Sequence, residues 1–245
     1  MLGAKDPRMM TTGNLDGRLQ LQFRCYSWQD PPPSQVTPIP VQVLRRLACI
    51  AAASRDPELQ AIADTIIIAF FFLLCPWEYT GTKSDSLPFQ LSDVTFSIGR
   101  TVFDTSTAND DDLAAATFVI LTFTTQKNGV RGEEIGHGAT GDPLLCPKEA
   151  LRRRVIHLRQ HDAPANTPLA RFKSPRVHWL NVTPPKITAH LNTTVKLFAG
   201  TPLGFTHHDV SARYLRAAGA MALLCSGVDK DIISLIGCWI SDKIC

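Results

Sequence analysis

The sequence predicts an α+β fold that is mainly α-helical and carries a small antiparallel β-sheet. Several long segments place apolar residues at the helical spacing, whereas two shorter segments are rich in β-branched and aromatic residues. One of the two runs into Asn128-Gly129, a strong hairpin signal because both residues tolerate a positive φ. The chain has 245 residues, 44% hydrophobic and 19% charged, which is enough to bury one large core.

The first 37 residues differ from the rest of the chain. Residues 1–29 have no sustained apolar period, and residues 30–34 read Asp-Pro-Pro-Pro-Ser. Proline-rich segments are stiff and extended, so this stretch is predicted to be a connector. We therefore expect a domain boundary near residue 37, with a linker over 1–37 and one folded domain over 38–245.

Two helices are predicted at the start of this domain. Residues 41–54 have apolar side chains at the helical spacing, and residues 57–74 form a more deeply buried helix. Pro76 is expected to end the second helix. Its most apolar run, residues 66–75, is shorter than the roughly 20 residues that a membrane span needs, so it is interpreted as core.

The sheet is predicted from residues 89–103 and 116–125, where β-branched and aromatic residues dominate. The second strand leads into Gln126-Lys127-Asn128-Gly129, which places Lys127 at a hairpin turn. The acidic stretch over 105–112 is predicted to be a loop between strands.

The remaining chain is predicted to be helical apart from one long loop. Gly227 is expected to join the last two helices in the left-handed conformation. The predicted segments are a helix over 147–161, a loop over 162–184, and helices over 187–198, 211–226 and 229–236.

The charged residues do not identify a binding partner. The net charge of +3 permits a nucleic-acid partner without requiring one. The helix over 147–161 carries Arg152, Arg153, Arg154, His157 and Arg159. This cluster fits a solvated basic face and a phosphate-contacting face equally well.

The pattern of cysteine and histidine residues argues against the disulfide bonds of an extracellular protein and against a metal site. The seven cysteines form no Cys-x-x-Cys pair, and no signal peptide precedes them, so we expect a reduced, intracellular protein. His207, His208 and Asp209 are adjacent, and adjacent side chains seldom converge on one ion. We expect no metal and no cofactor, and we interpret Asp209 as a cap for the helix predicted from residue 211.

The C-terminal segment carries an ordered motif. Arg213-Tyr214-Leu215-Arg216 opens an Ala/Gly-rich helix, Gly227-Val228 forms a turn, and Leu235-Ile236-Gly237-Cys238-Trp239 follows. This order resembles the C-terminal signature of tyrosine recombinases, the phage-integrase family, in which His-x-x-Arg precedes an apolar helix, a Gly-Val turn and a Leu-Gly-His/Trp box. It resembles most closely the recombinases of Crypton-like and DIRS-like eukaryotic mobile elements.

Earlier landmarks of the same family precede this motif. In the family, an Arg follows an apolar helix and is followed by a Glu three residues later and then by a Leu-x-Asp-Val strand start. Here residues 71–78 and Leu91-Ser92-Asp93-Val94 supply this pattern, with Cys75 in place of the Arg. Lys127 resembles the catalytic lysine of the family, which lies in a β-hairpin turn. The resemblance covers roughly residues 40–245.

The resemblance implies DNA recombination and integration through a phosphotyrosyl intermediate. In the family, two arginines bind the phosphate oxygens and the lysine is the general acid. Carried over, Arg216 is the second arginine, Lys127 the general acid and Trp239 the His/Trp position, while Arg213 replaces the His and Cys75 the first Arg. Taken alone, Lys127 is an ordinary solvated turn residue and Trp239 an ordinary core residue.

The family nucleophile has no counterpart in this sequence. It lies farther beyond the last box than Cys245, and none of Tyr26, Tyr79 and Tyr214 occupies its place. We therefore expect a catalytic domain truncated before the nucleophile, inactive in strand cleavage, with residues 1–37 as a remnant of the core-binding domain that precedes it in the family.

Two functions follow as hypotheses. The first is a nuclear protein that binds double-stranded DNA, with a homo-oligomer on DNA as one possibility and with no membrane or metal partner. The second is a non-enzymatic interaction domain, or a relic without a DNA function.

Overall fold

The computed structural model describes residues 38–80, 87–105, 107–124, 132–175, 178–198 and 205–237. All of them belong to Thr37–Cys245, one of the two units into which the chain divides. These residues are about 52% helical and include a small antiparallel sheet, which confirms the predicted α+β class. Among the residues described, no helix is long and apolar enough to cross a membrane.

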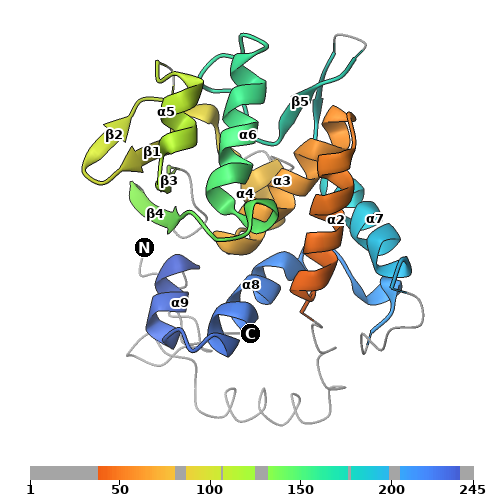
Figure 1. Cartoon of the computed structure of the whole chain (residues 1–245). Coiled ribbons are helices and arrows are strands. Elements are labelled where there is room, and N and C mark those ends of the chain that lie inside the picture. The colour runs from red at the N-terminus through yellow and green to blue at the C-terminus, as the bar shows by residue number, and fades with distance from the viewer. Residues whose placement is uncertain are drawn as a thin grey trace, which may run out of the picture. The chain divides into compact units, whose positions relative to one another are not determined.

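Helix α3 (Pro57–Phe71) is the central element of this unit. All residues from 61 to 70 are buried, so α3 has to be covered on every side. Apart from α2, which directly precedes it, the helices that cover it are distant in sequence (Figure 1). The covering helices are α2 (Val41–Ala53), α6 (Pro147–Arg159), α7 (Pro184–Lys196) and α8 (Tyr214–Cys225). The five corresponding helices predicted from the sequence are confirmed, to within a few residues at their ends.

The sheet contains four antiparallel strands in the order β2-β1-β3-β4. Figure 1 shows it on the opposite side of α6 from α2. Phe123 pairs with Glu133, so the strands on either side of the predicted hairpin turn are antiparallel neighbours. The turn itself, including Lys127, lies outside the described residues. The strands are β1 (Val94–Ile98), β2 (Thr101–Phe103), β3 (Phe118–Phe123) and β4 (Glu133–Gly138).

Several short elements depart from the sequence-based prediction. The predicted strand over 89–103 is a turn, η1 (Leu91–Asp93), followed by β1 and β2, which Gly99 separates with a φ of 58°. The predicted loop over 105–112 contains the start of α5 (Asp110–Ala115), because the Asn109 side chain accepts the Asp112 N–H at 2.7 Å and caps the helix.

The predicted loop over 162–184 is also wrong. It contains a hairpin of β5 (Arg171–Lys173) and β6 (Trp179–Asn181). Strands of three residues are too short to show an alternating pattern, so no periodicity identifies them in the sequence.

The end of α3 differs from the prediction as well. The helix ends at Phe71 because Leu73 adopts a left-handed conformation with φ 52°. Pro76, which was expected to end the helix, instead begins α4 (Pro76–Thr80). Proline suits this position because the first turn of a helix does not use its backbone N–H.

The C-terminal helices are joined as predicted. Gly227 has a φ of 80° and connects α8 to α9 (Lys230–Ile236). Asp209 does not cap α8, however, because α8 begins only at Tyr214. Instead Asp209 accepts the Thr206 N–H at 2.8 Å and closes a capping box over η3 (His207–Asp209). A further short turn, η2 (Pro143–Leu145), precedes α6.

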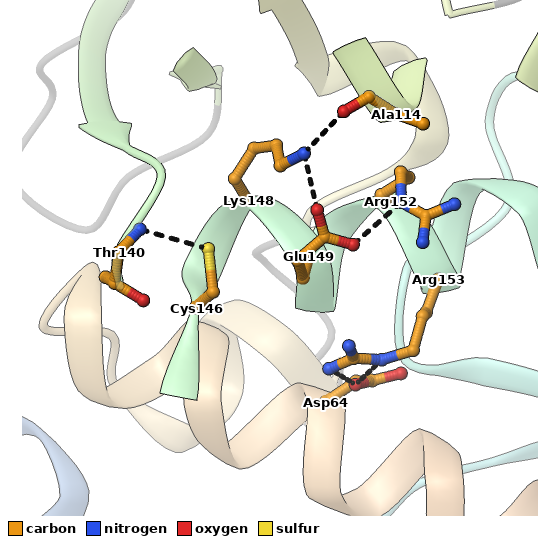
Figure 2. Close-up of polar contacts among 8 residues, drawn as sticks. All are labelled: Asp64, Ala114, Thr140, Cys146, Lys148, Glu149, Arg152 and Arg153. Atoms are coloured by element: carbon orange, nitrogen blue, oxygen red, sulfur yellow. Dashed lines mark hydrogen bonds and ion pairs between the residues drawn. The ribbon is translucent and has the colours of Figure 1, made fainter. Parts of the chain in front are cut away.

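The basic residues of α6 are engaged within the protein. Arg152 donates from Nε to Glu149 at 2.8 Å, one turn earlier on the same helix. Arg153 donates from Nε to the buried Asp64 of α3 at 2.8 Å, and its Nη2 lies 2.7 Å from the same oxygen. Figure 2 shows both pairs on one side of α6. Asp64 therefore faces α6, and only 5% of its side chain is exposed.

Arg154 is the most buried of these cations, with 2% of its surface exposed. Its Nε donates to Leu169 O at 2.9 Å, and its Nη2 donates to Arg171 O. Arg159 forms an ion pair with Asp110 at 3.8 Å. The arginines of α6 are therefore not simply free surface charges, because Arg153, Arg154 and Arg159 fasten α6 to α3, β5 and α5.

His157 joins α6 to the β5–β6 hairpin and should give the fold a pH-dependent stability. Its Nε2 accepts the Lys173 N–H at 3.0 Å, and burial, together with the Arg154 charge, lowers its pKa from 6.5 to about 4. A lowered pKa favours the neutral form in the folded state. The stability it contributes is complete above pH 6.5 and is lost as the pH falls through about 4.

We expect His157→Gln to make the stability of the fold less dependent on pH. Glutamine offers an oxygen to the same Lys173 N–H but does not titrate. Thermal unfolding between about pH 7 and about pH 4 should show a smaller drop in Tm for the variant than for the wild type. The matched control His208→Gln, at an exposed histidine, should keep the wild-type slope. Equal slopes for His157→Gln and the wild type would contradict this account.

Candidate functional site

Two of the five predicted site residues come together in space. Arg216 Nη1 donates to Cys75 Sγ at 2.7 Å, although the two residues are 141 positions apart in the sequence. Lys127 and Trp239 lie outside the described residues. Arg213 is an exposed residue at the N-cap of α8.

Cys75 lies in the short connection between α3 and α4. Leu73 enters this connection with a positive φ, an arrangement that costs a bulky residue about 1–3 kcal/mol. The Leu73 side chain is 1% exposed and packs against Ala220 of α8 and Ile233 of α9. Burial of this side chain offsets the backbone cost, and the resulting turn directs the chain toward α8.

Glu78 supports the Cys75 backbone. Its Oε2 accepts the Cys75 N–H at 2.5 Å, which holds the first turn of α4 against the end of α3. Burial raises the pKa of Glu78, while the Cys75 N–H and the Arg216 charge act in the opposite direction.

Arg216 bridges three segments of the chain. Besides its contact with Cys75, its Nη2 donates to the carbonyl oxygen of Gly237, the C-cap of α9. One guanidinium thus ties the first turn of α8 to the α3–α4 connection and to the end of α9. Gly237 immediately precedes Cys238 and Trp239, so the same contact anchors the start of the last motif.

Gly219 allows α8 to approach α3 this closely. A Cβ atom at this position would lie 2.1 Å from Phe70 O and 2.6 Å from Leu73 Cδ2. Only glycine fits such a backbone approach. Gly219 lies three residues after Arg216 on α8, so it sets the height at which Arg216 meets Cys75. Gly219 cannot be recognised from the sequence, because an Ala/Gly-rich helix gives no sign of which small residue is required.

The tyrosines in the described part have structural contacts. The Tyr79 hydroxyl donates to Ala212 O at 3.3 Å, and the side chain is 4% exposed. Burial is the main cause that raises the Tyr79 pKa, so its phenol stays protonated at neutral pH. Tyr214 is the first residue of α8 and packs against the main core.

The chemistry of this site is that of a single guanidinium. Arg216 presents a planar donor set, which suits oxyanions such as phosphate. Within the described ranges, no group of three or more His, Cys, Asp or Glu side chains is arranged to hold a metal ion. No family model matches the chain, and no curated protein matches it either.

We expect Gly219→Ala to disrupt the site by separating α8 from α3. The added methyl group overlaps backbone atoms that cannot move aside, so the free energy of unfolding should fall by about 1–3 kcal/mol. Urea unfolding measures this change. Gly141→Ala is the matched control, because its Cβ would have no neighbour within 4 Å. A Gly219→Ala protein as stable as this control would contradict the close approach.

Proposed function

We propose that this chain is a tyrosine-recombinase-like domain that binds double-stranded DNA without cleaving it. The contact between Arg216 and Cys75 is the observation that carries the proposal. The sequence resemblance aligns these two positions with the two arginines that bind one phosphate in the family. Two residues that share one phosphate must lie side by side in the fold, and a chance resemblance over 141 positions imposes no such proximity.

The surrounding fold is consistent with the proposal. Cys75 follows a buried apolar helix, Leu91–Asp93 lead into strand β1, and β3 and β4 are antiparallel neighbours on either side of Lys127. These are the elements that the family landmarks require, in the same order. They support the proposal as a set, because each of them alone is common.

Loss of cleavage follows from the residue at position 75. A thiol provides neither the planar donor pair nor the charge of the missing arginine, and removing one such donor typically costs about 10²–10³ in rate. In addition, Arg216 directs two nitrogens to Cys75 and Gly237. The buried Tyr79 and the core-packed Tyr214 are poorly placed to attack a phosphate.

Binding to DNA is expected to be weak and sensitive to salt. The arginines of α6 are held by Glu149, Asp64, Asp110 and backbone carbonyls, so they contribute little to a phosphate-binding surface. The exposed Arg213, three residues before Arg216, is the family position that we expect to contact a DNA phosphate. A nuclear location and assembly on DNA belong to the same proposal.

An interaction domain is the second candidate function. Four large apolar side chains on the C-terminal helices are 41–62% exposed, namely Met221, Leu224, Ile232 and Leu235. Exposed apolar groups of this kind favour a protein partner over DNA. DNA binding distinguishes the two candidates.

We expect the wild-type protein to bind a short DNA duplex at low salt, and Arg213→Ala to weaken this binding several-fold. Loss of one phosphate contact should also reduce the slope of log affinity against log salt by about 1. Fluorescence anisotropy over a salt series measures both quantities. Arg55→Ala, at an exposed arginine outside the family positions, is the control.

Absence of duplex binding by the wild type at any salt concentration would favour the interaction domain. A nicked duplex that traps phosphotyrosyl intermediates should yield no covalent adduct. An adduct would show that the protein cleaves DNA and would refute the proposed inactivity.

We expect Cys75→Arg to lower the stability of the protein and to raise its affinity for phosphate. A second guanidinium beside Arg216 should lower the free energy of unfolding by about 1–4 kcal/mol, since like charges about 4 Å apart repel. A bound phosphate removes this repulsion, so duplex DNA should raise the Tm of the variant more than that of the wild type. Thermal unfolding with and without duplex tests this, and Cys75→Gln controls for side-chain size. An equal effect of DNA on the Tm of both variants would contradict a phosphate site here.

A further inference from the structure

A cavity of about 470 Å³ lies between α2, α3 and α6. Its lining contains none of the residues aligned with the family site. Its volume falls in the range of small-molecule sites. Part of its wall is apolar and is built from small side chains, including Ala48 and Ala51 of α2 and Ala63 of α3. These alanines leave a space that leucine or isoleucine would fill in a closely packed core.

The opposite wall is basic. Arg152, Arg153 and Arg154 of α6 all line the cavity. The two carboxylates in contact with them are Glu149, which pairs with Arg152, and Asp64, which pairs with Arg153. Glu149 also pairs with Lys148 at 2.5 Å, so two carboxylates serve four cations and positive charge is in excess.

Arg154 is the one of the three arginines whose hydrogen bonds include no carboxylate. Its hydrogen-bond partners are the carbonyl oxygens of Leu169 and Arg171, which are neutral. Burial lowers the pKa of Arg154 to about 10, so the guanidinium is still charged at neutral pH. A buried cation without its own carboxylate is costly, and a bound anion would offset that cost.

The other polar groups of the cavity also suit an anion. The Arg152 nitrogens beyond Nε form no hydrogen bond with any residue that the structure describes, so they remain available as donors. Gln160 and His157 extend the polar side of the cavity. Figure 2 shows Arg152 and Arg153 projecting from the same helix, with Asp64 of α3 holding the latter in place.

We propose that this cavity binds a small organic anion, a compact apolar group that carries a phosphate or carboxylate. The anionic group lies against the arginines of α6, and the apolar group packs on the alanines of α2 and α3. Guanidinium groups recognise both oxyanions, and apolar contact adds affinity in proportion to the area buried. The inference is independent of DNA binding, because the cavity shares no residue with the Arg216 site.

Phenyl phosphate is the probe that tests the proposal on the wild-type protein. Calorimetric titration should show saturable binding, with inorganic phosphate at least about tenfold weaker because it lacks the apolar contact. Benzylamine, which has the same ring and the opposite charge, should not bind. In NMR spectra, phenyl phosphate should shift the amide resonances of Ala48, Ala51 and Gln160.

Two variants locate the site. Ala52 is exposed and lines the cavity, so Ala52→Trp should fill its mouth and weaken phenyl phosphate binding by about tenfold or more. Arg152→Gln should weaken it as well, because it removes a donor group without changing the apolar wall. Arg46→Gln, at an exposed arginine of α2 outside the cavity, should bind as the wild type does.

Three results would overturn the proposal. They are equal affinity for benzylamine and phenyl phosphate, resonance shifts confined to residues outside the cavity, and unchanged binding by a folded Ala52→Trp protein. If that variant does not fold, Arg152→Gln and the wild-type resonance shifts decide the question. None of these probes contains nucleic acid, so failure here leaves the DNA-binding test unaffected.

Discussion

The structure depends on the burial of helix α3 on all sides. Residues 61–70 expose almost nothing, and a helix without a polar face is stable only when other elements enclose it. The chain meets this requirement with helices taken from both its early and late parts, α2, α6, α7 and α8. Because α3 ends at the Leu73 turn, enclosing it also carries the first turn of α8 to Cys75. The same packing that buries α3 therefore also brings the residues of the candidate site together.

Helix α3 packs closely against α8 on one side, whereas a cavity separates it in part from α2 and α6 on another. Toward α8 the approach is so close that Gly219 has room for no side chain. Toward α2 and α6 the small alanines leave a cavity, with Asp64 and the arginines of α6 at its wall. The two candidate binding regions thus share one scaffold but differ in origin. One arises from helices that touch, and the other from helices that do not fully fill the space between them.

Charge has a structural role over most of this protein. The arginines of α6 hold the helix to α3, α5 and β5, and one of them has no carboxylate of its own. Arg216 likewise joins three segments. The net charge is only +3 in a chain proposed to bind DNA, and the cations engaged in this way contribute little to phosphate binding. Counting basic residues therefore overestimates the surface available to phosphate, because some of them, such as the arginines of α6, are already engaged.

The sequence by itself determined the long elements and the order of the motif residues. Periodicity identified the helices because each buries one face or all of its surface, and Gly227 was recognisable because a left-handed joint favours glycine. Only the tertiary structure decided the rest. The β5–β6 strands are too short to have a period, and the partners of Arg154 are carbonyls that no side-chain pattern reveals. The meeting of Cys75 with Arg216 required the close approach at Gly219, a long-range contact whose geometry no local spacing encodes.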